Sequence, residues 1–222
     1  MTIWFTSDTH FGHANIVRLA NRPFKDTKVR GEMIPAVQIM NEAIVNNWNA
    51  CVLPGDKVYH MGDVALGKID DSLEYIHRLN GEITLVTGNH DRNFRLGKRS
   101  AGLEPDEWDE RYKQFGFAHV VPGNLALSGF EGMEPVMLSH FPYTGDHFDG
   151  DRFEEVRAKD SGLPIVHGHT HAHTTITYSA RETLQIHVGV DSWNFRPVSY
   201  QQVTNIIRSL RVEGVDTASP VV

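Results

Sequence analysis

The residues best suited to chemistry fall in five short clusters, each directly after an apolar run. The clusters are Asp8-Thr9-His10, Gly62-Asp63, Gly88-Asn89-His90-Asp91, Ser139-His140 and Gly168-His169-Thr170-His171. Their carboxylate, amide and imidazole groups are oxygen and nitrogen ligands for metal cations, and none of the clusters contains a thiolate. Each cluster follows a candidate strand, so the sequence predicts a metal site built from strand ends.

The number and type of these side chains favour two ions over one. Seven candidate ligands are too many for one tetrahedral ion, but they suit two neighbouring ions that share a carboxylate and keep open positions. Mixed oxygen and nitrogen donors favour Mn, Fe, Zn, Ni or Co, with Mn the expected activator. Such a pair binds a hydroxide at neutral pH and clamps phosphoryl oxygens during in-line attack. The pattern therefore favours hydrolysis of a phosphoester.

Hydrophobic periodicity indicates the elements that position the clusters. Buried strands are expected at 3–6, 57–61, 82–87, 135–138 and 163–166, and an antiparallel pair at 174–178 and 183–190. Helices are expected at 14–20, 32–48, 69–79, 105–115 and 199–210, with edge strands at 120–121 and 125–127. In the second helix a stripe at spacings of three and four is expected to be buried, and Ser199 is the expected N-cap of the last; the stripe is Met33, Val37, Met40, Ile44 and Trp48. Strands that alternate with helices in the first half indicate a mostly parallel sheet with covering helices.

Two side-chain arrangements follow from strand geometry. An Asp8-x-His10 pair on extended backbone points both side chains to one side, because side chains alternate with period two. The same alternation puts the histidines of His167–His173 on one face if that strand continues, and two of the four are expected to bind metal. His60 is expected to be a packed histidine with a hydrogen-bond partner.

The order of the five clusters resembles the calcineurin-like metallophosphoesterases, from residue 3 to about residue 171. The opening Ser7-Asp8-Thr9-His10-Phe11-Gly12-His13-Ala14-Asn15-Ile16 also resembles a small bacterial and bacteriophage branch. The resemblance implies an α/β fold, a four-layered α/β/β/α sandwich of two mixed sheets with helices outside.

The resemblance also implies residue roles. Asp63 would bridge the two ions. His90 would face the substrate phosphate as the general acid, and Asp91 would orient His90. The ligands implied are Asp8, His10 and His171 for one ion, and Asn89, His140 and His169 for the other.

Residues outside the shared motifs are candidates for substrate contact. His13 and Asn15 lie close in sequence to the first cluster, although a capping role for His13 is an equal alternative. Arg92, Arg95, Lys98 and Arg99 form a basic segment that could receive an anionic substrate or be a solvated loop. Segments 92–134 and 141–151 are expected to set the choice of substrate.

Size and composition place limits on the class of protein. The 222 residues carry a net charge of −7, which disfavours long nucleic acid as a partner. Cys51 is the only cysteine, and neither a signal peptide nor a membrane-spanning run is evident, so a cytoplasmic location is expected. We expect one domain over 1–212 and a flexible tail over 213–222.

The sequence thus indicates a hydrolase of a small, nucleotide-like phosphomonoester or phosphodiester. The alternatives are a catalytically silent metal-binding or scaffold protein, and a nuclease acting on single-stranded nucleic acid. The preference for monoester or diester and the oligomeric state stay open.

Overall fold

Two five-stranded sheets form the centre of the protein. The computed structural model describes residues 1–96, 103–128, 135–146 and 150–215. In spatial order the first sheet contains β12 (Val198–Ser199), β1 (Ile3–Thr6), β4 (Lys57–His60), β5 (Glu82–Val86) and β6 (Phe117–Val121). The second contains β10 (Ile176–Tyr178), β11 (Leu184–His187), β9 (Ile165–His167), β8 (Val136–Leu138) and β7 (Leu125–Leu127).

Both sheets are mixed, and their central strands run parallel. Strands β1, β4, β5 and β6 are parallel neighbours, and β12 joins antiparallel to β1. In the second sheet β8, β9 and β11 are parallel, and the edge strands β7 and β10 are antiparallel. Parallel strands bring their carboxyl ends to one edge of a sheet, and all five predicted clusters follow such ends.

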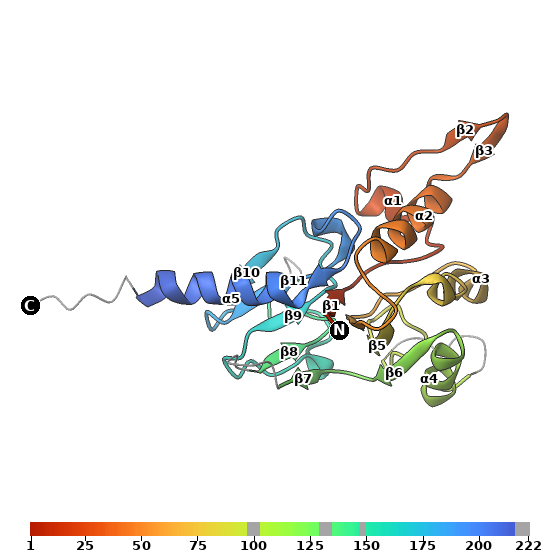
Figure 1. Cartoon of the computed structure of the whole chain (residues 1–222). Helices are drawn as coiled ribbons and strands as arrows, with labels where there is room; N and C mark the ends of the chain where they lie inside the picture. Colours follow the sequence, from red (N-terminus) through yellow and green to blue (C-terminus); the bar gives the residue numbers. More distant parts are fainter. Residues whose placement is uncertain (97–102, 129–134, 147–149, 216–222) are drawn as a thin grey trace, which may run out of the picture.

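The helices lie outside the sheets, so the predicted α/β architecture is confirmed (Figure 1). The described helices are α1 (Ile16–Leu19), α2 (Ala36–Asn49), α3 (Ile69–Leu73), α4 (Pro105–Gln114) and α5 (Tyr200–Val215). Short 3-10 turns form η1 (Ile76–Arg78), η2 (Glu154–Val156) and η3 (Val190–Ser192).

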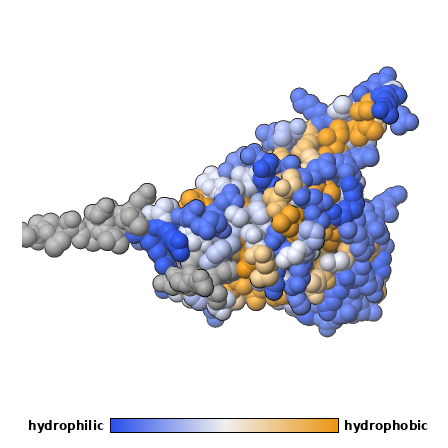
Figure 2. Space-filling view, viewed as in Figure 1, coloured by the Kyte–Doolittle hydropathy of each residue, from blue (hydrophilic) through white to orange (hydrophobic). Residues whose placement is uncertain are grey.

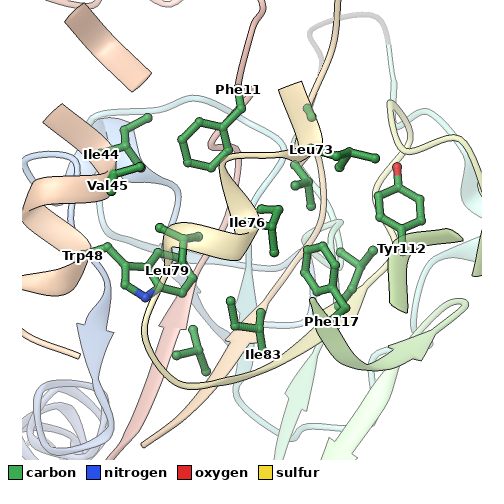
Figure 3. Close-up of a cluster of buried hydrophobic side chains, with 14 of the residues drawn as sticks. Phe11, Ile44, Val45, Trp48, Leu73, Ile76, Leu79, Ile83, Tyr112 and Phe117 are labelled. Atoms are coloured by element: carbon green, nitrogen blue, oxygen red, sulfur yellow. The ribbon is translucent and has the colours of Figure 1, made fainter. Parts of the chain in front are cut away.

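Two apolar cores hold these layers together. The first lies under α1 to α4 and includes Trp48, Leu73, Ile83 and Tyr112, which are labelled in the cluster of Figure 3. The second lies between the sheets, and α5 contributes to it. Its members from the sheets and from α5 include Phe5, Met61, Val86, Leu138, Val166, Ile186, Val203 and Ile207.

The helix predicted over 32–48 begins later, because Pro35 separates two structures. Residues Glu32–Ile34 form β3, which pairs with β2 (Thr27–Val29) in a hairpin that projects from the body (Figure 1). Proline disfavours helical backbone in the residue before it, so the helix begins only at Ala36. Met33, predicted to be buried, is 62% exposed on this hairpin, whereas Met40 and Trp48 are buried as expected.

Other boundaries differ modestly. The helix predicted over 69–79 is α3 followed by η1, and the one predicted over 14–20 shortens to α1. Helix α5 continues to Val215 and so enters the segment predicted as a tail. Its predicted N-cap is present: the hydroxyl of Ser199 accepts from the backbone amide of Gln202, and the Gln202 side chain accepts from the amide of Ser199.

The surface in Figure 2 is mostly hydrophilic, and apolar residues are visible on the projecting hairpin, where Val29 and Met33 are exposed. Among the described residues, no helix has the length and apolar composition needed to span a bilayer.

Candidate metal centre

Tight turns at the strand ends carry most of the candidate ligands. Asp8, His10, Asp63, His169 and His171 all have positive φ angles, between 49° and 71°. Non-glycine residues rarely adopt this left-handed conformation, and such strain is concentrated at functional sites. These turns place buried polar side chains at the common edge of the two sheets.

These turns also correct two expectations based on alternation. Strand β1 ends at Thr6 and β9 at His167, so neither Asp8-x-His10 nor the later histidines lie on extended backbone. The left-handed turns, and not the period of a strand, bring Asp8 near His10 and His169 near His171. His167 instead packs against His187, and the ring centroids are 5.4 Å apart.

Two glycines permit the close approach of these turns. A Cβ at Gly168 would overlap the hydroxyl of Ser7 and lie 2.5 Å from Oδ2 of Asp8. A Cβ at Gly88 would lie 2.5 Å from the backbone nitrogen of Asp63. Gly88 is therefore required for space, and its φ lies outside the left-handed range.

One ion position is defined by lone-pair atoms that face one another with no N–H or O–H group directed between them. Nε2 of His140 lies 3.0 Å from Oδ1 of Asn89, 3.2 Å from Nδ1 of His169 and 3.5 Å from Oδ2 of Asp63. Nδ1 of His140 contacts the carbonyl of Met61 at 2.7 Å, so it carries the proton and Nε2 presents a lone pair. Four lone-pair atoms facing one another repel unless a cation lies between them, so these residues fit a metal ion.

The second position is formed by Asp8, His10 and His171, whose ligand atoms lie within 4.8 Å of one another. His10 is buried, and neither of its ring nitrogens has a hydrogen-bond partner in the described part of the chain. Nε2 of His10 lies 3.6 Å from Oδ2 of Asp63, the oxygen that also faces His140. Asp63 thus lies between the two groups, in the place that the resemblance implied for a bridging ligand.

Burial makes both kinds of ligand suited to a cation. It lowers the pKa of His10, well below its ordinary value, and those of His140 and His169, so these rings are neutral and can donate lone pairs. Burial also raises the pKa of Asp8 and of Asp63, because a carboxylate is costly without a nearby positive charge. A bound cation would accept the lone pairs of the neutral rings and offset the cost of the buried carboxylates.

Asp191, which is not among the predicted site residues, holds His171. Nδ1 of His171 contacts Oδ2 of Asp191 at 2.8 Å, which leaves Nε2 for a metal. Burial alone would lower the pKa of His171, but the bond to Asp191 and the nearby Asp8 raise it overall. Arg22 donates to both oxygens of Asp191 and to the carbonyls of Asp8 and Thr9.

A second carboxylate holds His169 in the same way. Oδ2 of Asp146 lies 2.7 Å from Nε2 of His169, which directs Nδ1 toward His140. Arg157, which is buried, pairs with the same Asp146 oxygen at 2.8 Å. Asp146 belongs to a polar segment without hydrophobic periodicity, so the sequence did not predict this support. Asp191 was detectable, because it too follows an apolar strand.

Asp91 does not contact the His90 ring as the resemblance implied. Its carboxylate accepts hydrogen bonds from the backbone amides of Asp63, Val64 and Gly88, at 2.9, 3.0 and 2.8 Å. Burial, with a contribution from the charge of Asp63, raises the pKa of Asp91 to about 6. A buried carboxylate needs donors, and the nearest are these amides, so Asp91 fastens two ligand turns together.

A cavity of about 270 Å³ opens over the metal centre. Its wall includes His13 and the exposed His90, whose ring centroids lie 5.4 and 5.6 Å from that of His10. Arg152 also lines this cavity, and one of its terminal nitrogens lies 3.0 Å from Nε2 of His169. Asn15 is exposed and is not part of the wall.

The predicted basic contacts lie elsewhere. Arg95 pairs with Asp106 at 2.8 Å and lines a different cavity, and Arg92 lines neither cavity. Lys98 and Arg99 fall outside the described residues. The permanent cation of the cavity wall is therefore Arg152, among the residues that the structure describes.

His60 is a packed histidine, as predicted. It is fully buried, and its Nε2 lies 3.0 Å from the hydroxyl of Thr9. Burial lowers the pKa of His60 to about 3, so the ring is neutral.

Comparisons with known proteins identify the family and the fold. The family model described as "Calcineurin-like phosphoesterase superfamily domain" matches residues 1–194. The Gene 66 protein of Mycobacterium phage L5 is 30% identical, over 96% of this chain and 98% of its own length. The Gene 66 protein of Mycobacterium phage D29 is 31% identical, over 86% and 89%. The crystal structure of AQ665, a protein of unknown function from Aquifex aeolicus, superposes with a TM-score of 0.60, at 23% identity over 92% of this chain and 98% of that one.

Proposed function

Because this chain belongs to the calcineurin-like phosphoesterase superfamily, we propose that it is a metal-dependent hydrolase of a small, nucleotide-like phosphoester. The observation that carries the proposal is the convergence of lone pairs from Asn89, His140, His169 and Asp63 around one position. The neighbouring Asp8, His10 and His171 provide a second position, with Asp63 between the two.

Two bound ions would supply Lewis acidity, which lowers the pKa of water and withdraws charge from phosphoryl oxygens. The protein supplies the rest of the chemistry. His90 is exposed in the cavity wall, while its backbone amide donates to Oδ1 of Asp63 at 2.8 Å. This bond fixes the base of the side chain beside the metal centre. From this position His90 is proposed to give a proton to the leaving oxygen.

Arg152 is proposed to attract the phosphate. Its guanidinium lies at the cavity wall beside His169, and its side chain is 52% exposed. Nε of Arg152 pairs with Oδ2 of Asp146 at 3.3 Å, an oxygen that also contacts Arg157 and His169, so the terminal nitrogens of Arg152 keep donors for an anion. This position replaces the basic segment that the sequence suggested.

The test is hydrolysis of bis-p-nitrophenyl phosphate and p-nitrophenyl phosphate by the full chain, after chelator treatment and after addition of Mn²⁺. Activity that is lost and then restored, with two ions per chain by metal analysis, would support the proposal. Tight binding of metal with no turnover on a broad panel of nucleotides and aryl phosphates would favour the silent metal-binding protein. Cleavage of single-stranded DNA in preference to small esters would favour a nuclease. Manganese as the native metal and a cytoplasmic location stay predictions.

A further inference from the structure

A second cavity, of about 70 Å³, lies at the same edge of the sheets as the metal centre. Loops after β5, β6 and β8 meet there, together with the turn η2. These are largely the segments expected to set the substrate choice. The wall includes Phe94, Pro122, Asn124, His140, Phe141 and Val156.

This cavity adjoins the metal centre. His140, whose Nε2 faces Asn89, also forms part of the cavity wall. The ring of Phe141 lies between the two sites, with its centroid 4.9 Å from that of His140 and 4.8 Å from that of His169. A group held in this cavity is therefore close to a phosphate held at the metals.

The wall is aromatic and largely uncharged. Phe94 and Phe141 face the cavity with centroids 6.1 Å apart, and Phe153 packs against both, at 5.4 and 5.3 Å. Phe153 has a φ of 57°, a strained conformation for a bulky residue that the packing must hold. Arg95 is the one side chain with a permanent charge in the described wall, and it is paired with Asp106.

One polar group of the wall lacks a partner. Asn93 is buried, and its amide nitrogen donates to the hydroxyl of Thr87 and to Asp109. Its Oδ1 has no hydrogen-bond partner in the described part of the chain. That oxygen is buried and not exposed to the cavity, so the accessible wall is largely apolar and aromatic, which suits a flat ring.

We propose that this cavity binds the aromatic group of the substrate ester, a nucleobase, while the phosphate lies at the metals. This assignment rests on the proposed function and names the part of the substrate that the metal centre does not recognise. A nucleobase is such a flat ring, it belongs to the nucleotide-like ester proposed above, and its stacking on phenylalanine tolerates different bases. A simple aryl ring would stack in the same way, and the test separates the two occupants.

The test uses three esters: p-nitrophenyl thymidine 5′-phosphate, methyl p-nitrophenyl phosphate and ethyl phosphate. The first two share a leaving group and differ in the nucleoside. Val156→Trp fills the cavity at a residue that holds no metal ligand, and Val29→Trp on the exposed hairpin is the matched control. Wild-type protein should favour the thymidine ester roughly tenfold or more in kcat/KM, through KM. Val156→Trp should abolish this preference and leave ethyl phosphate unchanged.

Other outcomes are also decisive. Val156→Trp could lower kcat/KM equally for both nitrophenyl esters while Val29→Trp lowers neither. That result would identify an aryl ring as the occupant in place of a nucleobase. An unchanged preference, or an equal loss on ethyl phosphate, would overturn the assignment. Calorimetry compares thymidine 5′-phosphate with deoxyribose 5-phosphate, and so reports on the base without turnover. If nothing is hydrolysed but Val156→Trp removes the tighter binding of the nucleotide, the cavity assignment stands and the proposed function fails.

Discussion

The carboxylate of Asp91 accepts a hydrogen bond of 2.9 Å from the backbone amide of Asp63. The same oxygen accepts from the amide of Gly88, so one side chain joins the turn of Asp63 to the turn of Asn89. Asp91→Asn replaces an acceptor by an amide N–H₂ group that faces these donors. We expect metal affinity to fall by roughly 10- to 100-fold, the usual effect of removing support for a ligand. Metal titration followed by calorimetry measures this loss.

Asp109→Asn is the control for Asp91, because Asp109 accepts from the side chain of Asn93 and contacts no ligand turn. If Asp91 acted instead through the His90 ring, Asp91→Asn would keep full metal affinity and lose only turnover. That result would reinstate the role that the family resemblance implied.

His90→Ala should leave the metal content at the wild-type level, because no ligand atom is removed. Turnover should fall by ~10²-fold or more, the usual contribution of a general acid. The loss should be greater for an alkyl ester than for a nitrophenyl ester, since a poor leaving group depends more on the proton. Steady-state kinetics on both esters, with metal analysis of the same samples, checks this. An equal loss on the two esters would argue for a binding role of His90.

Arg152→Gln should raise KM for phosphate esters, because it removes the permanent cation of the described cavity wall. A charged hydrogen bond contributes roughly 1.5–3 kcal/mol, which corresponds to about 10- to 150-fold in kcat/KM. Arg95→Gln, which removes an exposed pair with Asp106, should change kinetics little. Similar effects of the two substitutions would show that Arg152 has no special contact with substrate.

Asp191→Asn should destabilise the folded chain, because it leaves the buried guanidinium of Arg22 without its carboxylate. Removal of one partner from a buried pair costs roughly 3–5 kcal/mol. Urea unfolding in the presence of chelator measures this cost apart from metal binding. Asp106→Asn breaks the exposed pair with Arg95 and should cost less than about 1 kcal/mol. A loss for Asp191→Asn as small as that of the control would contradict the structural role of the pair.

Asp160 should contribute acid-sensitive stability. Burial raises the pKa of the Asp160 carboxyl, but hydrogen bonds from Ser179, Thr183 and Gly162 lower it by more. The folded-state pKa therefore lies below 3.8. A folded-state pKa below the unfolded value stabilises the protein above about pH 4, and the benefit is lost as the pH falls through the folded pKa. The difference in unfolding free energy between wild type and Asp160→Asn should therefore shrink below pH 4. A difference that stays constant down to pH 3 would show that Asp160 does not titrate in this way.

Local sequence determined much of the fold. The strands and their terminal clusters are visible because an apolar run followed by Asp, Asn or His is a local pattern. The helix stripe of Met40, Ile44 and Trp48 is visible for the same reason. Pro35 shows the limit of periodicity. Extending the apolar stripe past Pro35 predicted a buried Met33, whereas Met33 lies on the hairpin and is exposed.

Only the tertiary structure decided how the ligands are held. Arg22 and Asp191 are 169 positions apart, and Asp146 reaches His169 from a loop with no periodic signal. Buried charges must find partners wherever the packed chain supplies them, and sequence spacing does not reveal which partner is near. For the same reason Asp91 bonds to backbone amides, Arg152 replaces Arg95 at the cavity, and the aromatic cavity forms from three separate loops. The candidate ligands could thus be identified from local sequence patterns. The residues that hold the ligands, and the proposed substrate cavity, depend on long-range packing.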